Sequence, residues 1–504
     1  MKTTIFATAL VTLTSVASLG IVATGAGAAG SAASTRPVMS ASATTIATLA
    51  PCKDLPALPT ARCGVLKLPL DRSRPEKGST AVAFALVPRT DLSKPGLGTI
   101  VPNPGGPGAS VIDLSGELFG QAFAALGDRR DLLLIDPRGV GRSGPITCPA
   151  LATADRLFSG LQRQRQLIGE CGRQLGKRVG DYGTAAFADD IDAVRARLGV
   201  DQLDLVGVSY STYLMPVYAH RHPKHVRTVT LAGAYAVNID AVGKNDVAAF
   251  RRAVKLVCER TQKCSGDKVL ADLGVLAARL RKHPDRVDVT YEGVTHRVVL
   301  DEWRMTSTAA SVYQSQPDTE TQLALASAAA AGRHGNLEPF RALVREGLTA
   351  TAGNLSLGSA LYSDTLAWAA TCHDYPRAFD YDDRQRTRLR DYERAQSHWK
   401  TADFFPFNPK AWVTRADYDT GACLAWPNDP TATSPLPKGA RLPDVPVLVL
   451  SGDLDANTSS ASGRQAAAQF PHATFKEIKN AGHTPASTPE GVGEILAFIA
   501  AGRA

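Results

Sequence analysis

Short apolar runs that end in glycine or proline turns, alternating with helical patterns, most constrain the fold of this chain. The runs GTIV, DLLLI and DLVG each stop at such a turn, and a helical pattern at residues 182–199 separates the last two. In that segment apolar side chains recur every three or four residues from Phe187 to Leu198, and Gly199 ends the pattern. Alternating strands and helices predict right-handed crossovers and a largely parallel sheet.

The alternation stops after Tyr235 and resumes after Arg441. Between them helical patterns dominate, with one hairpin pattern, VDVTYEGVTHRVVL. The runs VPVLVLSG and ATFKEI then restore the strands, and PEGVGEILAFIAAG predicts a final helix. We expect an α/β core in two parts, residues 50–234 and 442–504, with a large, mainly helical cap, residues 235–441, inserted before the last strands.

The first 33 residues have the pattern of a secretory signal peptide. A lysine at position 2 precedes a long uncharged segment that ends in small residues with A-x-A-like cleavage options. An uncleaved membrane anchor is the alternative, but Thr, Ser, Gly and Ala dilute the segment, and we find no second bilayer-spanning stretch. We expect an extracellular protein without a stable membrane anchor, with cell-wall association as an option, and a flexible segment at residues 34–49.

The eight cysteines fit export to an oxidising compartment. A metal site is the alternative, but the chain has no C-x-x-C and no histidines at ligand spacing beside its cysteines. Proximity in sequence suggests three disulfides, and the two cysteines that remain would form the fourth. Sequence alone does not prove this connectivity. These pairs are Cys52–Cys63, Cys148–Cys171, Cys258–Cys264 and Cys372–Cys423.

The formal net charge of +8 comes from scattered basic residues, which suits solubility better than nucleic-acid binding. We find no P-loop and no nucleic-acid motif, and we expect no nucleic-acid partner. The glycines of DPRGVGRSG lack the P-loop ending and the dinucleotide-binding spacing, so we interpret Asp136 and Arg138 as structural.

The stretch GVSYS, residues 207–211, nearly matches the nucleophile elbow G-x-S-x-G. Ser209 follows a buried strand and precedes a helix, so its hydroxyl would stand clear of the sheet, near helix amides that stabilise an oxyanion. Both flanking positions must be small. Gly207 meets this demand, but Ser211 replaces the second glycine. The alternative is an ordinary serine cap at a helix N-terminus.

A nucleophilic serine needs a base and an orienting acid, which follow an elbow serine in the order Asp, His. Asp455 comes just after the run VLVLSG, and His483 just after TFKEI, at strand ends where open sheets bind ligands. Asp453 is a rival closer to its strand, and His472 is a rival that precedes its strand. We predict the triad Ser209, Asp455 and His483.

The loop NPGGPG, residues 103–108, follows a predicted strand and has the glycines that let backbone N–H groups turn toward a reacting oxygen. We predict the backbone amides of Tyr210 and Gly106 as the oxyanion-hole donors. The alternative is a plain Gly/Pro turn.

In this order the motifs resemble the secreted tripeptidyl aminopeptidases and prolyl-aminopeptidase-like α/β-hydrolases of actinomycetes, a family of serine peptidases with a TAP-like C-terminal region. The segments that carry the resemblance are CGVLKLPLDRSRP, NPGGPGAS, IDPRGVGRS, YGTAAFADDIDAVRARLG, GVSYSTYLMPVYAHRHP, AATCHDYP, CLAWPNDP, LSGDLDANT and NAGHTP. The resemblance implies the α/β-hydrolase fold and the triad Ser209, Asp455 and His483. It also implies release of tripeptides, other short peptides or residues from the free N-termini of peptide substrates, without a metal or organic cofactor.

The chain departs from the family pattern at three places. Ser211 replaces the elbow glycine, LAGAYAV lacks an aspartate often found after the sixth strand, and DANTSS lacks a proline common after the catalytic acid. An aminopeptidase also needs carboxylates for the substrate ammonium, and Asp240 and Asp374 are options. Two other functions stay open: an esterase with the same triad, and an inactive binding protein, which only Ser211 favours.

Overall fold

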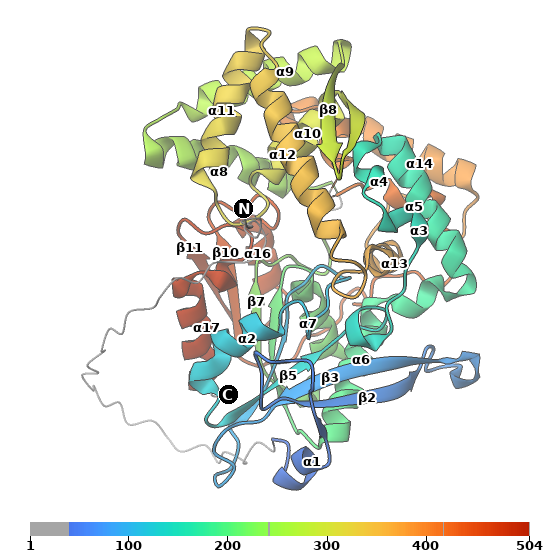
Figure 1. The fold of residues 1–504 in the computed structure, drawn as a ribbon, viewed down its shortest axis with the longest axis vertical. Helices are drawn as coiled ribbons and strands as arrows, with labels where there is room; N and C mark the ends of the chain where they lie inside the picture. The colour runs from blue at the N-terminus through green and yellow to red at the C-terminus, as the bar shows by residue number, and fades with distance from the viewer. Residues whose placement is uncertain (1–39, 240–241, 417, 503–504) are drawn as a thin grey trace.

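The computed structural model describes residues 40–239, 242–416 and 418–502. The predicted signal peptide, residues 1–33, and Asp240 lie outside the described residues. The described chain forms a sheet flanked by helices, and a second, mainly helical layer lies over one end of that sheet (Figure 1).

The main sheet has nine strands within the described residues, in the order β1-β2-β3-β5-β4-β6-β7-β10-β11. Their bounds are β1 Ala50–Pro51, β2 Arg62–Pro69, β3 Ser79–Val87, β4 Gly98–Asn103, β5 Arg130–Ile135, β6 Leu203–Val208, β7 Val226–Ala232, β10 Val447–Gly452 and β11 Ala473–Ile478. Pairing is antiparallel from β1 through β3 to β5 and parallel from β5 to β11. The predicted, mostly parallel sheet is therefore confirmed.

Helices cover both faces of this sheet, which is why its central strands are apolar along their whole length. Strands β4, β5, β6 and β10 are buried at every residue. The helices α1 (Ala43–Ala47), α6 (Thr184–Leu198), α7 (Ser211–Arg221) and α16 (Ser460–Ala467) contribute to the core of one face. The helices α2 (Gly116–Phe123) and α17 (Pro489–Ala501) contribute to the core of the other.

Helix α1 lies in the segment that the sequence predicts to be flexible. Ala41, Ile46 and Leu49 are buried in the core of the α6–α7 face. The hydroxyl of Ser42 caps the helix by accepting a hydrogen bond from the Thr45 amide at 3.0 Å. The prediction of a flexible segment at 34–49 is therefore wrong for residues 40–49, because their apolar side chains find a place in the core.

The second layer is made largely of elements that lie between β7 and β10 in sequence. Its helices are α8 Lys244–Thr261, α9 Gly266–Lys282, α10 Glu302–Ser311, α11 Thr319–Arg333, α12 Glu338–Leu355, α13 Asp364–Asp374, α14 Gln385–Ser397 and α15 Pro409–Val413. The predicted hairpin is present as β8 (Asp285–Tyr291) and β9 (Val294–Leu300). One apolar cluster, which contains the fully buried Phe250 and Trp412, joins most of these elements.

Three helices from the first part of the chain also belong to this layer: α3 (Pro149–Ala152), α4 (Asp155–Phe158) and α5 (Leu161–Leu175). Phe158 joins the large apolar cluster of the cap, and Ile168 packs in a smaller cluster with side chains of α13. The predicted boundary, with the core running unbroken from 50 to 234, misses this insertion. The apolar face of α5 needs a partner, and α13 and the segment near Trp426 provide it.

Short 3-10 helices complete the described elements. They are η1 Pro75–Lys77, η2 Ala124–Leu126, η3 Gly141–Ser143, η4 Gly176–Tyr182, η5 Pro223–His225, η6 Thr401–Phe404, η7 Ala422–Ala425 and η8 Pro485–Ser487.

All eight cysteines lie within the described residues, and they form four disulfides. The pairs are Cys52–Cys63, Cys148–Cys171 and Cys258–Cys264, as proximity in sequence suggests, and Cys372–Cys423, the pair left by remainder. Over residues 40–239, 242–416 and 418–502, none of the helices has the length and apolar character needed to cross a bilayer.

Candidate active site

Ser209 occupies a sharp turn between β6 and α7. Its φ angle is +55°, in the left-handed region that non-glycine residues rarely adopt outside constrained sites. The turn requires glycine at position 207, because a Cβ there would lie 2.4 Å from the carbonyl oxygen of Ser211. Local sequence thus builds the elbow, and the strained turn holds the Ser209 side chain at the carboxyl end of β6.

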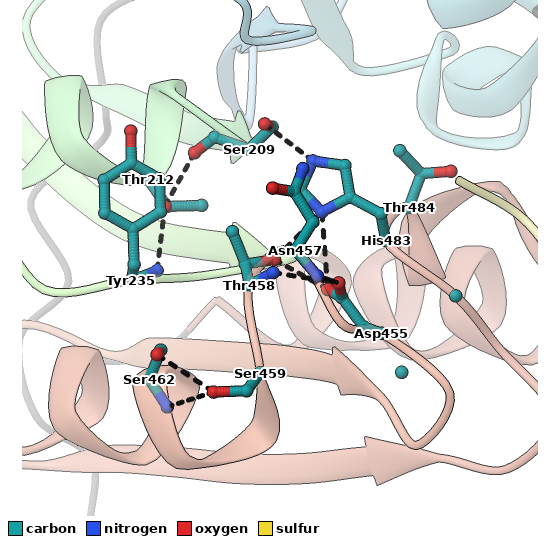
Figure 2. Close-up of polar contacts among 12 residues, drawn as sticks. Ser209, Thr212, Tyr235, Asp455, Asn457, Thr458, Ser459, Ser462, His483 and Thr484 are labelled. Carbon is teal, nitrogen blue, oxygen red and sulfur yellow. Dashed lines mark hydrogen bonds and ion pairs between the residues drawn. The ribbon is translucent and has the colours of Figure 1, made fainter. Parts of the chain in front are cut away.

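The structure brings the three residues of the predicted triad together, although 274 positions separate Ser209 from His483 (Figure 2). His483 Nε2 lies 2.8 Å from Ser209 Oγ, a hydrogen-bond distance. On the other side of the ring, His483 Nδ1 lies 3.3 Å from Asp455 Oδ2. Asp455 and His483 are buried, whereas Ser209 borders a cavity.

Thr458 is an additional polar partner in this group. Its hydroxyl donates to Asp455 Oδ2 at 2.6 Å and lies 2.9 Å from His483 Nδ1. Asp455 Oδ1 accepts two backbone amides, from Asn457 at 2.7 Å and Thr458 at 2.9 Å (Figure 2). These bonds fix the carboxylate as an acceptor toward the imidazole.

Both rival residues lie elsewhere. Asp453 forms an ion pair with Arg260 and accepts the Asn480 amide at 2.8 Å. His472 is exposed and pairs with Asp444 at 2.8 Å. Asp453 therefore holds the turns after β10 and β11, and neither rival reaches Ser209.

The two predicted oxyanion donors also lie beside Ser209. Gly105 and Gly106 both have positive φ, and a Cβ on Gly105 would lie 2.3 Å from the carbonyl oxygen of Val208. Gly106, Ser209 and Tyr210 line the same cavity. Among the described residues, the amides of Gly106 and Tyr210 donate no hydrogen bond to a protein acceptor. Both amides are thus free for an oxygen bound next to Ser209.

Ser211 is fully buried and its hydroxyl donates a hydrogen bond to Asn103 Oδ1. The same Asn103 oxygen accepts the Gly105 amide at 3.0 Å. The side chain that replaces the elbow glycine therefore ties the start of α7 to the glycine loop. This contact removes the physical basis for interpreting Ser211 as damage to the elbow.

A cap segment, Tyr313–Gln316, holds the two loops that carry Asp455 and His483. The Tyr313 carbonyl accepts the Ala456 amide at 3.1 Å, and the Ser315 carbonyl accepts the His483 amide at 3.2 Å. Gln316 Nε2 donates to Thr484 Oγ1 at 2.6 Å and to Ser487 Oγ at 2.8 Å. No motif marks this segment in the sequence, since its role depends on loops more than a hundred residues away.

The cavity beside Ser209 has a volume of about 340 Å³ and lies between the core and the cap. Three of its lining residues are carboxylates: Asp246, Asp364 and Asp419. Both oxygens of Asp419 are bound by Arg165 at 2.6 Å, whereas Asp364 bonds Arg156 through Oδ1 alone at 2.6 Å.

Aromatic side chains make up much of the remaining wall of the cavity. Burial raises the pKa of the Tyr362 phenol well above its usual range and that of Tyr375 to about 12. Burial also raises the pKa of the Asp364 carboxyl, while the charge and hydrogen bond of Arg156 act against this rise. The cavity thus combines aromatic walls with three carboxylates and two arginines, Arg156 and Arg377.

Asp374, an option from the sequence for binding a substrate ammonium, does not line this cavity. Its carboxylate bonds the His373 ring at 2.6 Å and the Thr184 amide at 2.7 Å. It borders a larger hollow of about 660 Å³, which shares Tyr375 and Arg377 with the cavity at Ser209. Because Ser209 is absent from the described lining of that hollow, we place no chemistry there.

Asp136 and Arg138 organise the core, as the sequence predicts. Asp136 accepts the amides of Val111, Ile112 and Arg142 at 2.7 to 2.9 Å. Arg138 forms a buried ion pair with Asp190 at 2.7 Å.

The site geometry suits acyl transfer. A serine hydroxyl, an imidazole and a carboxylate form a continuous chain, and beside it lie two residues, Gly106 and Tyr210, whose amides have no acceptor among the described residues. Among the described residues, the group with metal-ligand spacing lies away from Ser209, at Asp192, His222 and His225.

Comparison with known families agrees with this arrangement. Residues 98–299 match the family described as "alpha/beta hydrolase fold", and residues 409–503 match the family described as "TAP-like protein". The chain thus has the α/β-hydrolase fold and a TAP-like C-terminal region, which is consistent with a serine hydrolase.

Individual relatives extend the comparison. The chain is 36% identical to serine protease Hip1 of Mycobacterium tuberculosis over 197 residues, which is 36% of this chain and 37% of that protein. It is 27% identical to the tripeptidyl aminopeptidase of Streptomyces lividans over 443 residues, 79% of this chain and 73% of that protein. It is 33% identical to carboxylesterase B of M. tuberculosis over 233 residues, 42% of this chain and 44% of that protein. The chain thus spans little more than a third of the length of the Hip1 proteins it matches.

Proposed function

We propose that this chain is a serine exopeptidase that releases tripeptides, other short peptides or residues from the free N-termini of peptides. The observation that carries the proposal is the hydrogen-bonded chain Ser209–His483–Asp455 beside a cavity whose lining includes three carboxylates. The disulfides and the signal-like first 33 residues support action outside the cell. The relative named tripeptidyl aminopeptidase supports the choice of substrate class.

The mechanism follows from the contacts of the three side chains. His483 Nε2 takes the proton from Ser209 Oγ as the oxygen attacks the substrate carbonyl. The amides of Gly106 and Tyr210 stabilise the oxyanion, a contribution that is typically worth about 3 kcal/mol per donor. His483 then protonates the leaving amine, and a water molecule releases the acyl group. Asp455, held by two amides and by Thr458, orients the imidazole and stabilises its cation.

Asp364 is the acceptor that we assign to the substrate ammonium. Among the described residues, Arg156 is its only hydrogen-bond partner, so Oδ2 remains available to the cavity. Asp419 is less suitable, because Arg165 binds both of its oxygens. A charge-assisted bond to an ammonium is worth about 1.5–3 kcal/mol. Loss of this bond corresponds to roughly a tenfold to hundredfold loss of kcat/KM.

The test compares tripeptide p-nitroanilides with free and with acetylated N-termini. We expect cleavage of the free substrates, none by Ser209→Ala, and labelling of the wild type but not of Ser209→Ala by a fluorophosphonate. Asp364→Asn should lower kcat/KM for free peptides and leave turnover of p-nitrophenyl acetate unchanged, which controls for folding. Equal cleavage of free and acetylated peptides would exclude the exopeptidase proposal.

An esterase with the same triad is the second candidate, and the similarity to carboxylesterase B favours it. Rapid hydrolysis of p-nitrophenyl esters with no cleavage of any peptide anilide would establish this function instead. No labelling of the folded wild type by the fluorophosphonate would exclude both enzymes.

A further inference from the structure

Two histidines and two aspartates gather at the carboxyl end of α7. His222 follows this helix, His225 lies in η5, and Asp189 and Asp192 face them from α6. One ligand atom each from Asp192, His222 and His225 lie within 4.8 Å of one another. The three side chains are partly buried, with exposed fractions of 17%, 20% and 32%, so an ion from solvent can reach them.

The hydrogen bond to Asp189 fixes the tautomer of His222. His222 Nε2 lies 3.0 Å from Asp189 Oδ1, and because a carboxylate only accepts, Nε2 carries the hydrogen. In the neutral ring Nδ1 then holds a lone pair, yet it faces Asp192 Oδ2 at 3.6 Å. Two acceptors face each other at this point, and a cation between them makes the contact favourable.

A carboxylate that holds the outer nitrogen of a histidine is also the usual support of a metal-binding imidazole. Asp189 itself is held by Arg221, which bonds both of its oxygens at 2.6 and 2.7 Å. The ring of His222 is therefore fixed with Nδ1 toward the site.

Asp192 divides its two oxygens between different roles. Oδ1 accepts Arg195 Nε at 2.6 Å, Tyr218 Oη at 3.1 Å and, without an ion, the Nδ1–H of His225 at 2.7 Å. Among the described residues, Oδ2 has a longer contact of 3.4 Å with Arg195 Nη2 and its contact with His222, and no other polar partner. The arginine thus anchors the carboxylate through Oδ1 and leaves Oδ2 as the ligand atom.

We propose that His222 Nδ1, His225 Nδ1 and Asp192 Oδ2 bind a borderline divalent transition ion of the Zn²⁺ class, with Asp189 as the positioning residue. The ion displaces the proton that His225 Nδ1 donates to Asp192 Oδ1, and this proton is released to solvent. Two imidazoles and one carboxylate are a donor set for Zn²⁺ or Ni²⁺ and not for Mg²⁺ or Ca²⁺, which prefer oxygen ligands alone. Solvent provides the remaining ligand. The ion would link α6, the end of α7 and η5. This site does not depend on the proposed hydrolase activity.

The experiment is calorimetric titration of the EDTA-treated, dialysed full chain with Zn²⁺, with Mg²⁺ as the control ion. We expect the wild type to bind one equivalent of Zn²⁺ that the double variant His222→Ala/His225→Ala does not bind. In Asp189→Asn the affinity for Zn²⁺ should be about tenfold to a hundredfold weaker. His472→Ala removes an exposed histidine that also pairs with an aspartate, and it should leave the titration unchanged. Thermal unfolding in EDTA checks that each variant folds, and His222→Gln replaces the double variant if it does not.

Three results would overturn the proposal. The first is a wild type that binds no Zn²⁺, in which case a proton on His222 satisfies the contact with Asp192. The second is an unchanged titration in the folded double variant. The third is one equivalent of Zn²⁺ that the double variant still binds and that His483→Ala does not bind. That result would place the ion beside Ser209 instead.

Discussion

Restoring glycine at position 211 should harm this protein. The sequence alone suggests Ser211→Gly as a repair of the elbow. In the structure the Ser211 hydroxyl is fully buried and bonds Asn103, the residue that also holds the Gly105 amide at 3.0 Å. We therefore compare two changes, Ser211→Ala, which removes the hydroxyl, and Ser211→Gly, which also frees the backbone.

The magnitude follows from what each change removes. A buried hydrogen bond contributes about 0.5–1.5 kcal/mol net, and Asn103 Oδ1 keeps its bond from Gly105, so no acceptor is left unpaired. Ser211→Ala should therefore lower the free energy of unfolding by about 1 kcal/mol. Glycine in the first turn of α7 costs roughly a further 0.5–1 kcal/mol, which brings Ser211→Gly to about 2 kcal/mol.

Urea unfolding measures the stability change, and the rate of fluorophosphonate labelling measures the state of the site. The looser glycine loop should slow labelling several-fold in both variants. Ser451→Ala is the matched control, because Ser451 is fully buried in β10 and its hydroxyl has no partner among the described residues. A Ser211→Gly variant as stable as the wild type, and labelled as fast or faster, would refute the reasoning.

Three further predictions concern the cap. Gln316→Ala loses the bonds to the loop of the triad histidine, so kcat should fall about tenfold with little change in KM, as steady-state kinetics would show. Burial lowers the pKa of His373, but the bond and charge of Asp374 outweigh this and raise it. The charged His373 therefore stabilises the folded chain fully below about pH 6.5, the pKa of histidine in the unfolded chain, and this contribution is lost as pH rises through the higher pKa of the folded chain. In urea unfolding, His373→Gln should therefore lower the free energy of unfolding more at acidic than at alkaline pH. Replacing Cys372 and Cys423 by alanine opens a loop with a sequence separation of 51, and the unfolding free energy should fall by about 4 kcal/mol in the chain-entropy model.

The sequence predicts well whatever depends on neighbouring residues. The elbow at Ser209, the glycine loop and the strand that precedes Asp455 each follow from a short local pattern, and the structure brings them together. Three disulfide pairs also agree with sequence proximity, and the fourth is the pair that remains.

Contacts between distant segments could not be predicted in this way. The packing of α5 on α13 depends on two apolar faces about two hundred residues apart, and nothing local indicates that they meet. The bond between Ser211 and Asn103 likewise crosses from one strand end to another. Sequence analysis therefore interprets Ser211 as a departure from a motif, whereas its partner makes it part of the site.

The segment Tyr313–Gln316 has a consequence for how such enzymes can be re-engineered. Caps are usually treated as exchangeable modules that select the substrate while the core performs the chemistry. Here the cap backbone forms hydrogen bonds with the loops of Asp455 and His483. A transplanted cap must therefore contain an equivalent of Tyr313–Gln316 whose carbonyls lie in the same positions. A chimera without it would lose turnover before it gained a new specificity.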